Sequence, residues 1–394
     1  MALSYLDKAI VFLLPLLVFQ LFKDQKIYIS IEYIYSITTV VIPLIDLGLS
    51  GYFFYAYRNS DDKEFTVNIF VKSFQRLYII VCFIGLGLIA LNYFSFEFES
   101  FIVFIVSRLL FVLATVFFAS YYRLTNRPEK AVYITLASNI ISLSFLFGYF
   151  FLSLEFSLWL IFIGQILFSI IYFFKCIIDV LLKNNTKSYQ EQIKKIFLKA
   201  LLFSWPSIMQ VFIMMFITNF GKINVLTKMS LDDGVLLSLV QRFSMVIFLT
   251  HSSIWAFVLK DLYVEKNVLI IRRNLLYKYL AFLTLALSFV IFVTEIYLAN
   301  NYNDLFRVSY ISILIIGQTF LACVYAYLEV HYGRENKNII KLYLALFSAF
   351  VFLFILIVLD MNFLEKISIA MFVSTFLSLL VSIFILYKRN YKIA

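Results

Sequence analysis

Long apolar runs dominate this chain and restrict its fold more than any other feature. They reach about 18 to 25 residues each, the length that a helix needs to cross the hydrocarbon of a bilayer. Inside lipid every backbone polar group must find an internal partner, so runs of this length span as helices. Of 394 residues, 63% are hydrophobic and only 14% are charged. The sequence therefore predicts an all-α, multi-pass membrane protein.

The polar breaks between the runs predict about twelve transmembrane helices in two six-helix halves. We expect an N-terminal half over residues 1–182, a basic linker over 183–196 and a C-terminal half over 197–394. A duplicated transporter would join its two repeats at such a linker. The predicted spans are 5–22, 28–50, 77–94, 101–121, 131–152, 157–178, 197–218, 235–258, 275–298, 307–328, 340–359 and 367–387.

Lysine and arginine are distributed unevenly over the predicted loops. When both termini are placed in the cytoplasm, most of the 33 basic residues fall on the inner side. Cytoplasmic loops of membrane proteins carry this excess of positive charge. We therefore expect cytoplasmic termini and a location in the inner (cytoplasmic) membrane. The net charge of +10 then reflects membrane topology, and no nucleic-acid partner is expected.

Three basic residues lie inside predicted spans: Lys8, Arg108 and Arg242. A charge in hydrocarbon is costly, so each side chain either extends toward the headgroups or meets a partner. Arg108 and Arg242 come from different halves and could hold an anion together, because a guanidinium binds two phosphate oxygens at once. Lys8 follows Asp7 at the start of the first span. This pair could contact other helices, attract anionic headgroups, or be solvated.

Polar and helix-breaking residues also follow one face of the span over 28–50. They recur every three or four residues, as positions on one side of a helix do. Packing between helices would explain the hydroxyl groups. The carboxylates Glu32 and Asp46 also suit a water-filled cavity, or contact with water near the helix ends. The members of this stripe are Glu32, Ser36, Thr39, Pro43, Asp46 and Ser50.

Motifs of the common nucleotide-driven or hydrolytic enzymes do not occur. The chain has no Walker-type glycine loop, no HExxH and no Gly-x-Ser-x-Gly. Its three cysteines lie singly in apolar runs, which fits neither a disulfide framework nor a metal site. We expect a protein that is not an enzyme, with no catalytic residues, metal or cofactor.

Several short features combine into a resemblance. The stretch DLGLS, residues 46–50, closes the second span, and Pro15 and Pro206 lie in the first helix of each half. Gln241 precedes Arg242 in the eighth helix. Together with twelve spans and internal termini, these features resemble the Wzx-type O-antigen and polysaccharide repeat-unit flippases. Those proteins belong to the multidrug/oligosaccharidyl-lipid/polysaccharide (MOP) exporter superfamily, so the resemblance implies a MOP/MATE-like fold.

The resemblance also implies a substrate and a mechanism. The substrate would be an undecaprenyl-diphosphate-linked oligosaccharide, moved from the cytoplasmic to the periplasmic leaflet by alternating access. A polysaccharide polymerase and a chain-length regulator would be partners, beside the bilayer itself. Arg108 and Arg242 would bind the diphosphate, with Lys8, Glu32 and Asp46 as further substrate-binding residues. Asp7, Glu32 and Asp46 would be the candidates for ion coupling, since no nucleotide site is present.

Two alternatives remain open at this stage. An O-antigen polymerase or other membrane glycan enzyme would be expected to carry a large outer loop, whereas the longest outer connection here is only residues 219–233. A small-molecule or drug antiporter of the same superfamily would favour internal carboxylates, because its substrates are mostly cationic. Two internal arginines favour an anion, but Glu32 and Asp46 keep the antiporter possible.

Overall fold

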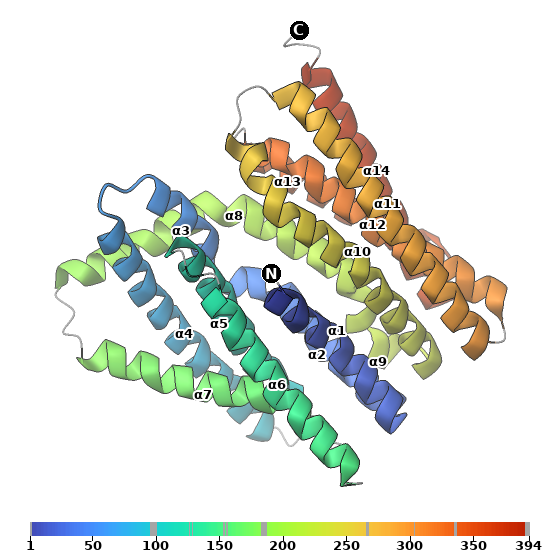
Figure 1. Ribbon diagram of the computed structural model, residues 1–394, viewed down its shortest axis with the longest axis horizontal. Coiled ribbons are helices and arrows are strands. Elements are labelled where there is room, and N and C mark those ends of the chain that lie inside the picture. The colour runs from blue at the N-terminus through green and yellow to red at the C-terminus, as the bar shows by residue number, and fades with distance from the viewer. Residues whose placement is uncertain are drawn as a thin grey trace. The chain divides into compact units, whose positions relative to one another are not determined.

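In the residues that it describes, the computed structural model consists of helices joined by short connections (Figure 1). These are residues 2–94, 101–125, 127, 129–152, 154, 157–182, 187–264, 268–302, 304–334 and 337–390. Within them lie fourteen helices, and eleven are long and apolar enough to cross a membrane. The chain forms two compact units, Met1–Phe212 and Ile213–Ala394. The prediction of an all-α, multi-pass fold is confirmed.

Unit 1, Met1–Phe212, is built around three pairs of packed helices. Helix α2 packs on α5, and α6 packs on both α1 and α7. Stacked aromatic rings fill the core near α3, and the ring centroids of Phe74 and Phe117 are 3.9 Å apart. The complete helices of this unit are α1 (Ala2–Phe22), α2 (Gln25–Ile45), α3 (Leu49–Arg58), α4 (Lys63–Phe94), α5 (Phe101–Leu124), α6 (Glu129–Phe151) and α7 (Trp159–Leu182).

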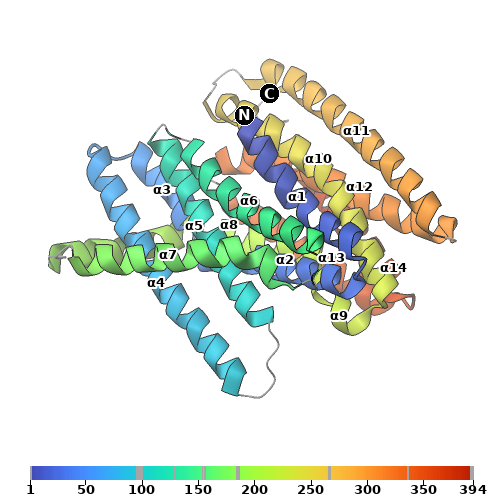
Figure 2. The same ribbon diagram turned by 60° about the horizontal axis from the view of Figure 1, so that its bottom comes forward.

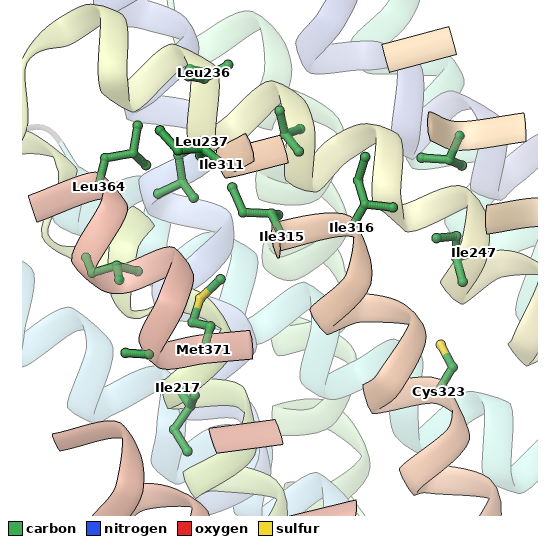
Figure 3. Packing of buried hydrophobic residues seen from close by; sticks show 14 of the residues in the cluster. Ile217, Leu236, Leu237, Ile247, Ile311, Ile315, Ile316, Cys323, Leu364 and Met371 are labelled. Atoms are coloured by element: carbon green, nitrogen blue, oxygen red, sulfur yellow. The ribbon is translucent and has the colours of Figure 1, made fainter. Parts of the chain in front are cut away.

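Unit 2, Ile213–Ala394, is organised around α10 and α12. Helices α10, α11 and α12 run side by side (Figures 1 and 2), and α14 packs on both α12 and α13. Figure 3 shows the apolar cluster where α10, α12 and α14 meet, with Leu237, Ile315 and Met371 in it. The helices are α9 (Val225–Lys228), α10 (Leu231–Val264), α11 (Val268–Asn301), α12 (Leu305–Arg334), α13 (Asn338–Val358) and α14 (Phe363–Asn390).

Helix α8 (Lys187–Ile223) carries the chain from unit 1 into unit 2. It begins inside the segment predicted as a linker, 183–196, which is therefore helical from Lys187 onward. Residues 183–186 lie outside the described residues. The division at Phe212 falls within the helix, so the boundaries 1–182 and 197–394 of the two predicted halves stay a prediction.

Polar ends of helices explain the largest differences from the predicted spans. Helix α4 starts at Lys63, well before the predicted start at residue 77, because polar turns at a membrane surface can continue an apolar helix. Helix α1 covers the first predicted span, 5–22, and the eleven membrane-length helices match the other spans. The connection 219–233, which the sequence predicts to be on the outer side, is largely helical, since it holds the end of α8, all of α9 and the start of α10.

The prediction of one helix over 28–50 is wrong at its end. Helix α2 stops at Ile45, and Leu47 and Gly48 have positive φ angles of 50° and 68°. Gly48 is the residue before α3, and its left-handed conformation costs little energy because glycine has no Cβ. The backbone carbonyl of Gly48 accepts a hydrogen bond from the Ser204 hydroxyl at 3.3 Å. The polar stripe is therefore divided between two helices, with Ser50 on α3.

Close helix contacts in both units are completed by polar side chains. Gly164 of α7 lies against the backbone carbonyl of Ser138 on α6, and a Cβ there would collide with that oxygen. One turn along α6, the Ser142 hydroxyl donates to the carbonyl of Ile161 at 2.7 Å. In unit 2, Arg307 Nε of α12 donates to Glu365 of α14 at 2.7 Å. Its Nη2 lies 3.5 Å from Asp233 of α10, so one arginine joins three helix ends.

Replacing Gly48 with alanine should destabilise unit 1. The new Cβ would collide with the Ser204 side chain and would occupy a left-handed backbone position. We expect the free energy of unfolding to fall by about 1 to 3 kcal/mol, measured by thermal unfolding in detergent. Gly51→Ala is the matched control, because its Cβ would meet open space in α3. Equal stability of the two variants would contradict the close approach of α8 to Gly48.

Candidate functional site

The guanidinium of Arg108 lies on the face of an aromatic ring in the middle of unit 1. Its Cζ is 3.4 Å from the centroid of the Tyr35 ring, which α2 places opposite α5. A cation is attracted to the negative face of an aromatic ring, and the attraction grows as water is removed. Arg108 is half-buried within a predicted membrane span. The contact with Tyr35 therefore stabilises a positive charge that hydrocarbon alone would not stabilise.

Residues from two other helices, α2 and α7, surround this guanidinium. Nη1 of Arg108 donates to the side-chain oxygen of Gln165 on α7 at 3.5 Å, a long hydrogen bond. Tyr35 is fixed in turn by edge contact with Phe162, at 6.1 Å between centroids. Glu32 is one helical turn before Tyr35 on α2 and is only 1% exposed. Residues at this spacing share a helix face, so a carboxylate and a guanidinium occupy the same α2–α5 region.

This arrangement is suited to binding an anion. The contacts with the Tyr35 ring and with Gln165 limit the movement of the guanidinium, and the N–H groups of arginine all lie in the plane of that group. A phosphate or carboxylate group approaching the edge of the plane can therefore be bound by two parallel hydrogen bonds. The contacts of Arg108 with α2 and α7 fix its position for such a ligand.

Asp46 has a structural role at the break between α2 and α3. Its carboxylate accepts hydrogen bonds from the Ser50 hydroxyl at 2.7 Å and from the Ser50 backbone N–H at 3.3 Å. A carboxylate in this position satisfies donors in the first turn of α3 and interacts favourably with the positive end of the helix dipole. Asp46 and Glu32 thus lie in different surroundings, although the sequence predicted one polar stripe for both.

Asp7 connects α1 to α6. The Asn139 side-chain amide donates to the Asp7 carboxylate at 2.8 Å, and Asn139 is 8% exposed. Both Asp7 and the adjacent Lys8 are half-buried. A carboxylate that is partly shielded and held by an amide offers oxygen ligands for a proton or a small cation.

Arg242 belongs to unit 2 and is 2% exposed, the largest of the fully buried side chains. Its neighbours along α10 make polar contacts with other helices. The Gln241 amide donates to the carbonyl of Thr218 on α8 at 3.0 Å, and Thr319 of α12 donates to the Ser244 hydroxyl at 3.0 Å. Arg242 therefore lies in a segment of α10 whose polar side chains contact α8 and α12.

Sequence reasoning missed three residues of these sites. Gln165 and Asn139 are side-chain amides within predicted membrane spans, and that signal could have identified both. Tyr35 gave no signal, because the chain has 27 tyrosines and spacing alone does not select one.

Comparison with known proteins identifies the fold. No family model and no curated protein matches the sequence. The structure is similar to that of "Lipid II flippase MurJ, inward closed conformation", with a TM-score of 0.52 and 16% identity over 93% of this chain and 87% of that one. It is also similar to the inward-facing conformation of a multidrug resistance MATE family transporter of the MOP superfamily. That match has a TM-score of 0.55 and 12% identity over 98% of this chain and 94% of that one.

The chain has the fold of MOP-superfamily transporters. Both similarities extend over nearly the whole length of each protein, so the fold is shared as a whole rather than in one segment. The predicted MOP/MATE-like fold class is therefore confirmed. The sequence identities establish the fold alone, and the substrate has to be argued from the residues of this chain.

A double-mutant cycle can test the contact between Arg108 and Tyr35. Combining Arg108→Gln with Tyr35→Leu should give a favourable coupling energy of about 0.5 to 2 kcal/mol in thermal unfolding. Tyr35→Phe retains the ring face and should therefore retain most of the stability lost in Tyr35→Leu. A coupling energy of zero would contradict the stacking geometry.

Proposed function

We propose that this protein is a flippase for an oligosaccharide linked to undecaprenyl diphosphate. It would move the repeat unit of an O-antigen or capsule from the cytoplasmic to the periplasmic leaflet of the inner membrane by alternating access. A polysaccharide polymerase and a chain-length regulator would act on the product. The single observation that carries this proposal is a half-buried guanidinium, Arg108, held on Tyr35 within a membrane helix.

The anionic part of the substrate explains why a positive charge is kept there. A diphosphate would lose its hydration in crossing the membrane, and protein hydrogen-bond donors would have to replace the water. Arginine does this well because its planar fork binds two oxygens and its charge is permanent. The fold supports the same class of activity, since MurJ is a lipid flippase and shares it.

Glu32 would balance the charge of Arg108 when no substrate is bound. The two residues lie on facing helices, with Tyr35 one turn from Glu32 and under the guanidinium. A bound diphosphate would replace part of this interaction, so that Arg108 is neutralised both with and without substrate. Arg242 would provide the second cation and Lys8 a further one. Asp46, as the cap of α3, would shape the end of α2 near the substrate.

Ion coupling would use Asp7. The carboxylate is positioned by Asn139 across two helices, so a change in its protonation or ion occupancy would alter the α1–α6 contact. An ion gradient could then favour one conformation over the other. Glu32 and Asp46 are weaker candidates, because Glu32 would balance Arg108 and Asp46 accepts two hydrogen bonds from Ser50.

Deleting the gene from its host tests the proposal directly. Single lipid-linked repeat units should accumulate on the cytoplasmic side, and surface polymer should be lost. Single repeat units capped onto the cell surface would instead indicate a polymerase. An unchanged glycan pool together with increased sensitivity to cationic compounds would indicate a drug antiporter.

Arg108→Gln should reduce flipping in complemented cells by about 10- to 100-fold, the loss expected for a hydrogen bond to a charged group. Arg242→Gln should have a similar effect, and Arg108→Lys should be intermediate because charge remains without the fork. Arg123→Gln is the matched control, since Arg123 is an exposed cation at the end of the same helix. Normal export by Arg108→Gln at normal protein level would exclude the diphosphate role.

Asp7→Asn should remove the dependence of flipping on an imposed proton or sodium gradient while substrate binding is retained. Asn139→Leu should weaken the same dependence, because it removes the donor that positions the carboxylate. Both can be measured in energised membrane vesicles. Asp61→Asn changes an exposed carboxylate and should have no effect. Full gradient dependence in Asp7→Asn would assign the coupling to another residue.

A further inference from the structure

A polar cavity lies between α4 and α7 in unit 1, away from Arg108. Its lining includes Lys72 and Arg76 of α4, with Asn68 and Gln75 from the same helix and Asp179 from α7. The cavity volume is about 90 Å³. This is room for about three waters, at roughly 30 Å³ each, or for one group of comparable size.

The cavity lies at the end of the apolar part of both helices. Arg76 is the last charged residue of α4 before its apolar run begins at Leu77. On α7, the apolar run ends at Phe174 and Asp179 comes one turn after Lys175. The distribution of basic residues predicts that this end faces the cytoplasm. The cavity is thus at the depth of lipid headgroups.

The lining has the charge and geometry of a phosphate site. Lys72 and Arg76 are four residues apart, so α4 presents both cations on one face. The Gln75 amide donates to the Asp179 carboxylate at 2.8 Å, which positions this acid beside the cations. Two positive charges and one negative charge leave a net charge of +1. A phosphodiester carries one negative charge and would neutralise it.

The surface next to the cavity suits an acyl chain. Ile80 and Phe83 continue the same face of α4 toward the middle of the membrane and are 54% and 61% exposed. The ring of Phe83 contacts that of Phe173 on α7, at 6.0 Å between centroids. An amphipathic ligand can therefore place its headgroup in the cavity and its chain along this apolar surface.

We propose that this cavity binds the phosphodiester headgroup of an anionic phospholipid of the cytoplasmic leaflet. Arg76 and Lys72 bind the phosphate oxygens, and Asn68, which is exposed at the edge of the cavity, contacts the rest of the headgroup. The bound lipid joins α4 to α7 and stabilises unit 1. This site is distinct from the proposed diphosphate site, because it lies between α4 and the end of α7, whereas Arg108 is on α5 and contacts Tyr35 of α2 and Gln165 of α7.

Lipid binding to the full-length protein tests this assignment. The purified, delipidated protein is titrated with phosphatidylglycerol and, separately, with phosphatidylethanolamine, and bound lipid is counted by native mass spectrometry. Phosphatidylglycerol should bind more tightly. Arg76→Gln should weaken its binding by about tenfold or more, the effect of losing one hydrogen bond to a charged group. Arg76→Lys should retain part of the affinity.

The matched control is Lys63→Gln, which removes a positive charge from an exposed position of the same helix and should leave binding unchanged. Equal binding of phosphatidylglycerol to Arg76→Gln and to the unchanged protein would overturn the proposal. Displacement of the lipid by inorganic phosphate at equal concentration would also overturn it and indicate a site for free phosphate. Undecaprenyl diphosphate is tested in the same way. If it binds more tightly than phosphatidylglycerol and this binding is lost in Arg76→Gln, the proposal is overturned and the cavity is a substrate site.

Discussion

Polar and charged groups inside the membrane require partners within the protein, and the structure depends on this requirement throughout. The backbone satisfies it by forming helices, and side chains satisfy it by contacts between helices. Arg108 meets Tyr35 and Gln165 from two other helices, and Asp7 meets Asn139. In unit 2, the Tyr279 hydroxyl donates to the carbonyl of Cys323 and therefore accepts from His251 Nδ1. These contacts fix which helices lie together.

The same requirement separates polar side chains that connect helices from a charged side chain, Arg108, that indicates a function. Hydroxyl and amide groups can be retained because they connect helices, as Ser142 and Gln241 do. A half-buried arginine stacked on a tyrosine has a larger desolvation cost than a hydroxyl or amide group. Packing alone does not require it, since an apolar side chain would fill the space without a charge. A ligand with negative charge at the same depth gives a reason for keeping it. Under the proposed function, that ligand is the diphosphate of the lipid-linked substrate.

Much of the fold could be predicted because its main signal is local. An apolar run long enough to span the membrane forms a helix regardless of what surrounds it, so eleven of the twelve predicted spans are matched, in order, by membrane-length helices of the described residues. The ends of the helices could not be predicted in this way, because the first turns of α4 and α8 are polar and give no apolar signal. The break after Ile45 depends on a left-handed Gly48 packed against Ser204, a residue distant in sequence. Arg108 could be singled out in the sequence as a charge within a predicted span, but Tyr35 could not, because its contact with Arg108 depends on the packing of α2 against α5.

Reconstitution of the purified protein offers the most direct measurement. Vesicles would contain a fluorescent oligosaccharide on undecaprenyl diphosphate, and a membrane-impermeant quencher would report how fast the label reaches the outer leaflet. We expect rapid exchange in vesicles with the protein and slow exchange both without protein and with Arg108→Gln. Exchange no faster than in protein-free vesicles, together with uptake of a cationic dye, would contradict the flippase assignment and support drug transport.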